Sequence, residues 1–232
     1  MTFIGKNIKF LREQQQLPDK KLAMMCNMTV DALHAIENNS HEPNLQQLVL
    51  LAEALNYPID RLIADNLEKN YYTLKSFDFK FLALDIDGVL TNGGMYYTES
   101  GDEFKKFDTK DGLAIKTLIA AGNNVGFLSS GINSNIIEKR AQLLGVQKVY
   151  VGTWKKLEVL EGWCKELNIG LENVAYVGDD VNDLQVIQKV GLSACPADAV
   201  TLVKEASNIV LSKKGGCGCV REFIEKFLMD IR

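Results

Sequence analysis

The first 66 residues of the chain place apolar side chains at the spacing of amphipathic helices. Ile4, Ile8 and Leu11 recur every three or four residues, and comparable runs follow up to residue 64. Residues at this spacing share one face of a helix. Proline and asparagine separate the runs, and Thr29 stands where a helix N-cap is expected. The pattern therefore predicts five short helices, over residues 4–15, 19–25, 29–38, 44–55 and 59–64.

From residue 79 onward the pattern changes to short apolar runs that alternate with helical stretches. We expect strands at 81–84, 124–128, 148–151, 173–177, 191–195 and 208–211. The stretches between and after them predict helices at 113–121, 136–144, 157–167, 183–190, 199–206 and 218–228. Alternation of this kind predicts a parallel sheet with helices on both faces.

Two segments depart from this alternation. In residues 92–108, apolar and polar side chains alternate on both sides of Glu99-Ser100-Gly101. This pattern predicts two strands joined by a turn, a β-hairpin. Residues 67–78 fit neither the helical nor the α/β pattern, and we interpret them as a linker. The predicted organisation is a small all-α domain over residues 1–66, a linker over 67–78 and an α/β domain over 79–232.

Composition narrows the class of protein. The chain is 47% hydrophobic and 24% charged, which is typical of a globular protein. Its net charge of −4 gives no reason to expect non-specific binding to nucleic acid or membranes. Apolar runs stay well short of the roughly 18 residues of a membrane helix, and the N-terminus turns polar too early for a signal peptide. Five scattered cysteines predict free thiols in a cytoplasmic protein.

Histidine is confined to the N-terminal part of the chain. The two histidines are His34 and His41, so residues 67–232 contain none. This excludes serine–histidine triads, histidine phosphatases and histidine-ligated zinc from the α/β domain. Chemistry there must use carboxylates, lysines, hydroxyls or thiols.

The first α/β strand ends on two acids. The apolar run 81–84 leads into Asp85-Ile86-Asp87-Gly88, and ligands of open α/β sheets bind at the carboxyl ends of the strands. Two carboxylates this close repel each other. Mg²⁺ relieves such repulsion, because it takes carboxylate and carbonyl oxygens as ligands. On this motif alone, an acidic turn without a cation remains an open alternative.

Three later strand ends carry further polar groups. They are Ser129-Ser130-Gly131, the lysines Lys155 and Lys156, and the run Gly178–Asp183, which reads GDDVND. A hydroxyl and a lysine bind phosphoryl oxygens. Among grouped acids, some bind Mg²⁺, one can attack phosphorus and another can move a proton. Collected at one sheet edge, these residues predict a site for phosphoryl transfer.

The order DIDGV, strand-end serine, lysine and GDDVND resembles the haloacid dehalogenase (HAD) superfamily over residues 79–232. The resemblance implies a Rossmann-like core in which Asp85 is the nucleophile and forms an aspartyl-phosphate. It implies that Asp87 protonates the leaving alcohol and then activates water, which favours phosphatases over dehalogenases. Mg²⁺ would be held by the Asp85 carboxylate, the Asp87 main-chain carbonyl and Asp179. Asp183 would orient the metal shell, a role that Asp180 could share.

The same resemblance implies the groups that hold the phosphate. Ser129 binds a phosphoryl oxygen, and Lys156 binds the phosphoryl group and offsets the charge of Asp85. Ser130 stays an alternative to Ser129, because the loop is one residue longer than the usual Thr-Gly. Lys155 is the weaker alternative to Lys156, because the Lys-Leu pairing favours the second lysine.

The chain leaves no room for the cap domain that most HAD phosphatases insert. Only 41 residues separate Asp87 from Ser129, and fewer separate Ser129 from Lys156. The segments LDIDGVLTNGGMYY, GDEFKKFDTKDGLAIK, NVAYVGDDVNDLQVIQKVGLSACPADA and KKGGCGCVREFIEKFL resemble the capless 3-deoxy-D-manno-octulosonate 8-phosphate (KDO-8-P) phosphatase group. Relatives in that group act on 9-phosphates of nonulosonates, the nine-carbon sialic-type sugar acids. The resemblance implies a homotetramer with the hairpin in its shared core and the glycine-rich segment 215–218 reaching a neighbour's active site.

Two departures leave the substrate and one motif open. The group has Arg or Glu soon after the second motif, whereas Gly131 is followed here by Ile132. The identity of the sugar acid is therefore open, with KDO-8-P first and a nonulosonate 9-phosphate next. Cys217 and Cys219 form a Cys-x-Cys pair, which fits a soft-metal or redox site or a plain tail.

The N-terminal module, from IGKNIKFLREQQ to NYPIDRLI, resembles the phage-repressor-like (Xre-type) helix-turn-helix family. In that family the second crossed helix, here 29–38, reads bases in the major groove. Residues 1–66 carry six positive and eight negative side chains, and 29–38 has no Lys or Arg. Asp19 replaces a glutamine that commonly touches DNA. Because phosphate neutralisation supplies most non-specific affinity, DNA binding and a role in assembly both stay open.

The features of the whole chain are compatible with three functions. The first is a Mg²⁺-dependent phosphatase for the phosphate ester of a 2-keto-3-deoxy sugar acid. The second is a transcription regulator whose HAD domain senses a sugar phosphate, and the third is a scaffold. Every catalytic position is filled, including Asp87, which a sensor would not need. The sequence therefore favours the enzyme.

Overall fold

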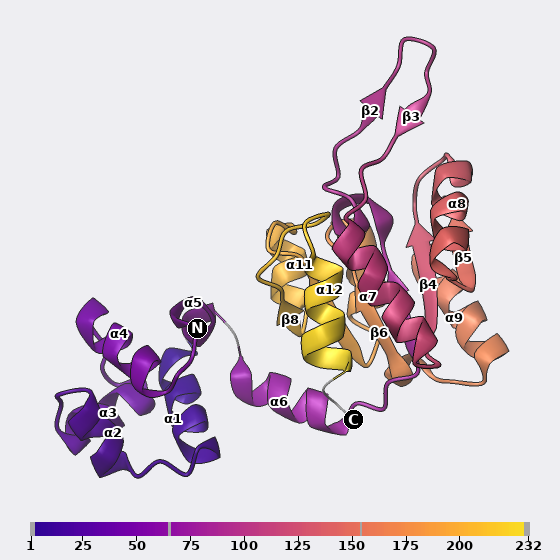
Figure 1. Cartoon of the computed structure of the whole chain (residues 1–232). Helices are drawn as coiled ribbons and strands as arrows, with labels where there is room; N and C mark the ends of the chain where they lie inside the picture. The colour runs from indigo at the N-terminus through magenta and orange to yellow at the C-terminus, as the bar shows by residue number, and fades with distance from the viewer. Residues whose placement is uncertain (1–2, 65, 154, 230–232) are drawn as a thin grey trace. The chain divides into compact units, whose positions relative to one another are not determined.

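The structure of the protein is a computed structural model, shown in Figure 1, in which residues 3–64, 66–153 and 155–229 are described. The backbone falls into two compact units that divide between Tyr72 and Thr73. The first unit is helical. The second contains a parallel sheet with helices on both faces, so the predicted fold class is confirmed.

Five short helices form the N-terminal unit, as predicted. They are α1 (Ile4–Gln14), α2 (Asp19–Met25), α3 (Val30–Glu37), α4 (Leu45–Ala54) and α5 (Ile59–Ala64). The Thr29 hydroxyl accepts a hydrogen bond from the Ala32 N–H and caps α3. Asn44 and Gln47 form a capping box at the start of α4. The apolar residues that share one face of each helix meet in one buried cluster, which includes Ile8, Leu22, Leu33, Leu51 and Leu55.

A buried ion pair and a buried amide connect helices of this unit. Arg12 donates to both carboxylate oxygens of Glu37, at 2.6 and 2.9 Å, and Glu37 is almost fully buried. Glu37 therefore faces the core and is not part of a DNA-reading surface. The Asn7 amide donates to the Leu62 carbonyl and accepts from the Leu67 N–H. Leu67 begins α6 (Leu67–Ser76), a helix in the stretch that we interpreted as a linker.

The second unit is built on six parallel strands in the order β5-β4-β1-β6-β7-β8. The strands are β1 (Phe81–Leu84), β4 (Asn124–Ser129), β5 (Lys148–Val151), β6 (Val174–Val177), β7 (Leu192–Cys195) and β8 (Ile209–Val210). The helices are α7 (Thr109–Ala120), α8 (Ser134–Leu144), α9 (Lys156–Leu167), α10 (Leu184–Ile187), α11 (Thr201–Ala206) and α12 (Cys219–Phe223). The chain order reverses on either side of β1, which makes its carboxyl end the switch point where α/β proteins bind ligands.

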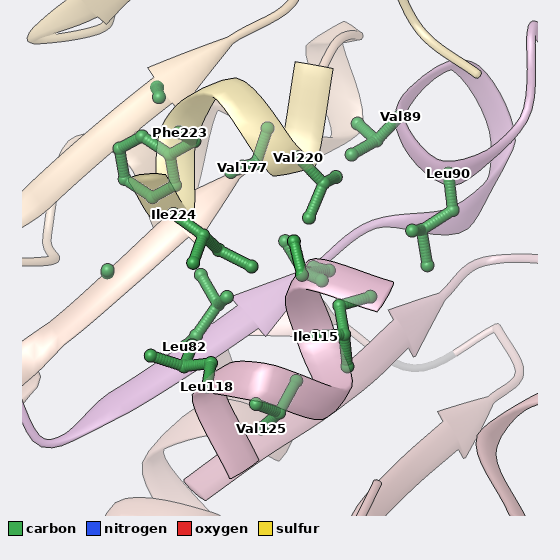
Figure 2. Packing of buried hydrophobic residues seen from close by; sticks show 14 of the residues in the cluster. Leu82, Val89, Leu90, Ile115, Leu118, Val125, Val177, Val220, Phe223 and Ile224 are labelled. Atoms are coloured by element: carbon green, nitrogen blue, oxygen red, sulfur yellow. The ribbon is translucent and has the colours of Figure 1, made fainter. Parts of the chain in front are cut away.

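Both faces of β1 are buried, which explains its unbroken apolar run. Leu82 and Leu84 point into the core on the side of α7, α8 and α12. In Figure 2, which shows this side, Leu82 and Val125 of the sheet lie in one buried cluster with Ile115 of α7 and Phe223 of α12. Phe81 and Ala83 point the other way, into a second cluster with residues of α9, α10 and α11. A strand covered on both sides must be apolar at every position.

A two-stranded hairpin leaves the compact part of this unit between β1 and α7 (Figure 1). It consists of β2 (Tyr96–Tyr97) and β3 (Glu103–Phe104), which pair antiparallel as predicted. Tyr96, Tyr97 and Phe104 are each at least half exposed. Among the described residues, no helix is long and apolar enough to cross a membrane.

Candidate active site

The carboxyl end of β1 delivers Asp85 into a buried position. The Asp85 N–H donates to the Val177 carbonyl at 3.0 Å, which extends the pairing of β1 with β6 by one residue. Residues 86–90 then form a wide turn in which Gly88 has φ +87°. A side chain at Gly88 would be strained in this conformation. It would also collide with the Asp179 carboxylate. Glycine at this position therefore lets Asp179 approach the turn that follows the first acid.

Lys156, at the start of α9, joins two of the predicted carboxylates. Its Nζ lies 2.8 Å from Asp85 Oδ1 and 2.6 Å from Asp183 Oδ1, and the side chain is 2% exposed. Burial lowers the pKa of Lys156, but the charges of Asp85 and Asp183 outweigh burial and leave the pKa raised. Lys155 is 72% exposed and pairs with Glu158. The structure therefore brings Lys156, and not Lys155, to the site.

Asp183 is the most heavily hydrogen-bonded acid of the site and is fully buried. Its Oδ1 accepts from Lys156 Nζ and from the Tyr176 hydroxyl, both at 2.6 Å. Its Oδ2 accepts from the N–H groups of Asp179 and Asp180, at 2.9 and 3.3 Å. Both oxygens are thus engaged in holding the lysine and the GDDVND turn in place. Tyr176 was not predicted, because a tyrosine within a buried strand reads as a core residue.

The acids form a cluster with the properties of a cation site. One oxygen each of Asp85, Asp179 and Asp183 lie within 4.8 Å of one another. Asp179 Oδ1 is buried and has no hydrogen-bond partner among the described residues. Burial, together with the charges of Asp183 and Asp180, raises the pKa of Asp179 to about 7. Burial and the Asp183 charge also raise the pKa of Asp85. An unpaired buried carboxylate oxygen among acids fits a hard divalent cation, which would oppose both shifts.

Asp180 has a different environment from Asp183. It is exposed, and its Oδ1 accepts from the Val181 N–H at 2.7 Å, which caps the short helical turn Val181–Asp183. This turn takes up the first residue of the helix predicted over 183–190, and α10 begins at Leu184. We expected that Asp180 could share the role of Asp183. Its contacts are different, because Asp180 caps a turn whereas Asp183 holds Lys156 and Tyr176.

Asp87 lies at the open side of the site, with 38% of its side chain exposed. Its Oδ1 accepts from Lys105 Nζ at 2.7 Å and from the Thr91 hydroxyl at 3.3 Å. Lys105 also contacts Glu103 at 2.7 Å. Sequence reasoning assigned no role to Lys105 or Glu103. The signal was their spacing of two residues on one arm of the hairpin, which places both on the same face of a strand.

The two serines after β4 lie in different surroundings. Ser129 is buried, and its Oγ accepts from the Gly131 N–H at 3.1 Å. Ser130 is exposed and accepts from the Asn182 amide at 3.2 Å. A Cβ at Gly131 would lie 3.2 Å from Ser129 Oγ and 4.0 Å from Asp87 Oδ2. Ser129 and Asp87 thus border the same small space beside Gly131.

A cavity of about 340 Å³ adjoins this space, and we call it the Asp87 cavity. Its walls come from the turn after β1, the hairpin, the loop after β4 and α8. They include Met95, Tyr97, Glu103, Lys105, Gly131 and Asn133. Ile132, where the resemblance led us to expect a charged residue, is 91% exposed.

The glycine-rich segment 215–218 packs against the chain's own active-site turn. The Gly216 N–H donates to the Val89 carbonyl at 2.9 Å, and a side chain at Gly215 would collide with the Gly88 carbonyl. The buried carboxylate of Asp111 accepts from the N–H groups of Gly218 and Arg221, at 3.2 and 2.7 Å. The resemblance implied that this segment reaches the active site of a neighbouring subunit. A single chain does not test that contact.

The two thiols of the Cys-x-Cys pair are in different environments. Cys217 is exposed, whereas Cys219 is buried and its thiol donates to the Val89 carbonyl at 3.3 Å. Burial raises the pKa of Cys219, which disfavours its thiolate. A packing role therefore accounts for Cys219.

Comparison with known proteins gives consistent results for both parts of the chain. A helix-turn-helix family profile matches residues 8–62, and a profile of haloacid dehalogenase-like hydrolases matches residues 128–224. The KDO-8-P phosphatase of Escherichia coli K12 is 37% identical over 155 residues, which cover 67% of this chain and 82% of that protein.

Solved structures of the same kind of protein are also similar. The KDO-8-P phosphatase of Moraxella catarrhalis, in complex with a magnesium ion, a phosphate ion and KDO, has a TM-score of 0.65 at 31% identity, covering 68% of this chain and 91% of that one. The cobalt-bound enzyme of Haemophilus influenzae has a TM-score of 0.63 at 36% identity, covering 67% of this chain and 90% of that one.

Proposed function

The chain belongs to the KDO-8-P phosphatase family of haloacid dehalogenase-like hydrolases, and we propose that it hydrolyses the phosphate monoester of a 2-keto-3-deoxy sugar acid. KDO-8-P is our first candidate substrate and a nonulosonate 9-phosphate the second. The observation that carries the proposal is the buried contact of Lys156 with both Asp85 and Asp183, beside the unpaired oxygen of Asp179.

The proposed reaction has two steps that use the same two acids. Asp85 attacks phosphorus and forms an aspartyl-phosphate, while the bond to the leaving oxygen breaks and Asp87 gives that oxygen a proton. Water then attacks the same phosphorus, Asp87 takes its proton, and the acyl-phosphate bond breaks to return Asp85 and inorganic phosphate. Ser129 and Lys156 hold the phosphoryl oxygens, and Lys156 also offsets the charge of Asp85.

Mg²⁺ is our proposed cofactor. The Asp85 and Asp179 carboxylates and the Asp87 main-chain carbonyl would hold it, and when bound it offsets the negative charge of the transferring group. Asp183 is the less suited ligand, because its two oxygens already accept four hydrogen bonds. We propose that Asp183 holds Lys156 and the Asp179 backbone in position, and that Asp180 serves as a turn cap.

We propose that the substrate's sugar acid occupies the Asp87 cavity. The cavity adjoins the acid/base and the loop after β4, and it has polar groups from the hairpin and α8 side together with apolar walls. Such a mixture suits a hydroxylated carbon chain. Because Ile132 replaces the family's charged residue, selectivity among sugar acids must come from other groups of this cavity or from a neighbouring subunit.

A homotetramer is our proposed assembly. The hairpin exposes Tyr96, Tyr97 and Phe104 together. Exposed apolar side chains gathered on one element mark contact surfaces. A neighbour that covers them would also help to close an active site that has no cap domain.

For the helix-turn-helix module we propose DNA as a partner to be tested against a role in assembly. The fold supports DNA binding, whereas the charges oppose it, because acidic side chains lie on the two crossed helices. Asp19 at the start of α2 lies 3.3 Å from His34 of α3, and Asp31 is exposed. A gel shift at low salt with DNA from the protein's own operon separates the two. Retarded DNA supports the regulator, and unshifted DNA at low salt overturns it.

The test of the catalytic proposal is phosphate release with Mg²⁺ from KDO-8-P and from a nonulosonate 9-phosphate. We expect turnover of one of them and a loss of at least about a thousandfold in kcat for Asp85→Asn. Turnover that survives Asp85→Asn would refute the assigned nucleophile. No turnover of any sugar acid phosphate would favour the sensor.

A further inference from the structure

The side chain of Lys105 is almost fully covered, although the hairpin arm that carries it is exposed at the neighbouring residues. Phe104, the preceding residue, is 57% exposed, whereas the Lys105 side chain is 4% exposed. Its Nζ lies 2.7 Å from Asp87 Oδ1 and 2.7 Å from Glu103 Oε1. An ammonium group is seldom buried unless it is paired. The position of Lys105 is therefore set by these two carboxylates.

Glu103 is itself fixed from the opposite side. Its Oε2 accepts from the Asn133 amide at 2.7 Å, and its side chain is 7% exposed. Asn133 lies in the loop between β4 and α8. A continuous chain of contacts thus runs from Asn133 through Glu103 and Lys105 to Asp87. It joins the loop after β4, the base of the hairpin and the turn after β1.

The contacts of Asp87 divide its two oxygens between different tasks. Oδ1 accepts from Lys105 and Thr91. Oδ2 is the oxygen nearer to Gly131, beside which the Ser129 hydroxyl also lies. Because Asp87 is partly exposed, its side chain would sample other rotamers without these partners. Lys105 therefore contacts the oxygen of Asp87 other than the one that lies beside Gly131 and Ser129.

We propose that Lys105 is a positioning residue for the acid/base, and that it holds Asp87 Oδ1 so that Oδ2 exchanges the proton with the leaving oxygen. The inference rests on the proposed function. In the first step the phosphorus–oxygen bond to the alcohol breaks and the Asp87 proton passes to that oxygen. Lys105 keeps its protons throughout. Glu103 and Asn133 hold the ammonium in place, so the base of the hairpin belongs to the catalytic apparatus of its own chain.

A purely structural role for Lys105 makes a different prediction from a positioning role. If Lys105 only fastened the hairpin, its loss would slow every phosphate ester by the same factor. If it positions the general acid, its loss slows esters in proportion to their need for a proton. Good leaving groups, such as para-nitrophenolate, depart without one, whereas the alkoxide of a sugar does not.

The experiment compares Lys105→Met with the wild type on KDO-8-P, phenyl phosphate and para-nitrophenyl phosphate, with Mg²⁺. The measured quantity is kcat/KM. It reports on the steps up to and including the first phosphoryl transfer, and so it does not depend on the later hydrolysis of the intermediate. We expect a loss of about a hundredfold on KDO-8-P, in the usual range for general acid catalysis, and of less than about threefold on para-nitrophenyl phosphate. Phenyl phosphate should fall between them. Because neither aryl ester carries the sugar acid that the Asp87 cavity would hold, a larger loss on phenyl phosphate than on para-nitrophenyl phosphate reports proton donation and not a lost contact with the sugar. Lys105→Arg, which keeps the positive charge, should restore part of the loss on KDO-8-P.

Lys106→Met is the matched control, because Lys106 is the exposed neighbour of Lys105 on the same arm, and it should retain wild-type rates on all three esters. Equal losses on all esters for Lys105→Met would overturn the positioning role. If the wild type hydrolyses the two aryl esters but not KDO-8-P, the proposed substrate fails, and the ratio between the aryl esters still decides the role of Lys105. Absence of turnover with every ester would overturn both proposals.

Discussion

The carboxylates of the active site differ in the hydrogen bonds that they make, and these differences indicate a separate role for each acid. Asp183, Asp179 and Asp85 lie together, yet their partners differ. Asp183 holds a lysine, a tyrosine and two backbone N–H groups, while one oxygen of Asp179 has no partner within the described part of the chain. A carboxylate whose oxygens are engaged positions its neighbours, and one with an unpaired oxygen is available to a cation. Hydrogen-bond partners thus separate residues that the sequence presents only as an acidic run.

Tyr176 should stabilise the fold through its hydroxyl. Tyr176→Phe removes the 2.6 Å hydrogen bond to Asp183 inside the core and keeps the ring. We expect the free energy of unfolding to fall by about 1–2 kcal/mol, because a buried acceptor loses one of its partners. Chemical denaturation measures this. An unchanged midpoint and slope would contradict the contribution assigned to this hydroxyl.

Asp111 should make stability depend on pH. Burial raises its pKa from 3.8 to about 6, so between these values the folded state binds the proton more tightly than the unfolded state. The contribution is therefore present at low pH and is lost as pH rises through about 6, by up to about 3 kcal/mol. Denaturation of the wild type and Asp111→Asn at pH 4.5 and 7.5 tests this. The wild type should lose more stability than the variant on going to pH 7.5, and parallel behaviour would contradict it.

Among the elements, the turn after β1 depends on a segment far away in the chain. Segment 215–218 packs on Gly88 and Val89. The Asp111 carboxylate accepts hydrogen bonds from the N–H groups of Gly218 and Arg221, which follow it by more than 100 residues in the chain. The turn that follows Asp85, our proposed nucleophile, is thereby supported from the C-terminal end of the unit. This contact explains why the segment is rich in glycine, since side chains would prevent the close approach of the two backbones.

Gly215→Ala should disturb catalysis more than an ordinary glycine substitution. The new Cβ would collide with the Gly88 carbonyl, so the turn that carries Asp87 must shift. We expect a fall of about tenfold or more in kcat, because small displacements of reacting groups are costly. Stability should fall by about 1–3 kcal/mol. Gly162→Ala in α9, where a Cβ meets open space, is the control and should be neutral or stabilising by up to about 1 kcal/mol. Equal behaviour of the two variants would contradict this account.

For the chain as a whole, the hairpin is the element through which copies should meet. The proposed tetramer predicts a scattering mass of about four times the 25.8 kDa of one chain. Replacing Tyr96 and Phe104 together by lysine should yield smaller species, because the exposed aromatic pair of the hairpin would carry charge. Size-exclusion chromatography with light scattering measures this. A wild-type monomer would overturn the assembly, and a variant that stays tetrameric would move the contact elsewhere.

Helices and strands could be predicted from the spacing of apolar residues, and the polar residues at the strand ends could be predicted to lie at one edge of the sheet. Contacts between side chains that are far apart in the chain could not be predicted. The placement of Asp85, Ser129 and Lys156 near one edge of the sheet was predictable, because Asp85 follows β1, Ser129 ends β4 and Lys156 comes soon after β5. Helix α7 begins at Thr109, before the predicted residue 113, because Asp108 caps it by accepting from the Lys110 N–H.

The residues that sequence analysis missed are those whose partners lie on other elements. Lys105 and Lys106 are alike in sequence, and only the pairing of the hairpin turns the first inward. Asp111 finds its partners 107 and 110 residues later. Helix α6 was missed because its polar pattern resembles a linker, whereas Leu74 packs on the core of the second unit. For Asp111 and α6 the deciding contacts lie in tertiary structure, whereas for Lys105 the spacing from Glu103 along the hairpin arm was the available signal.

The central claim is that Asp85 carries the phosphoryl group during turnover, and trapping the phosphoenzyme tests it most directly. Enzyme mixed with KDO-8-P and Mg²⁺ is quenched in acid within one turnover, digested, and its peptides are weighed. We expect one added phosphoryl group on the peptide that contains Asp85, and none in Asp85→Asn. Release of phosphate with no phosphoryl group on that peptide at any quench time, together with an active Asp85→Asn variant, would contradict it.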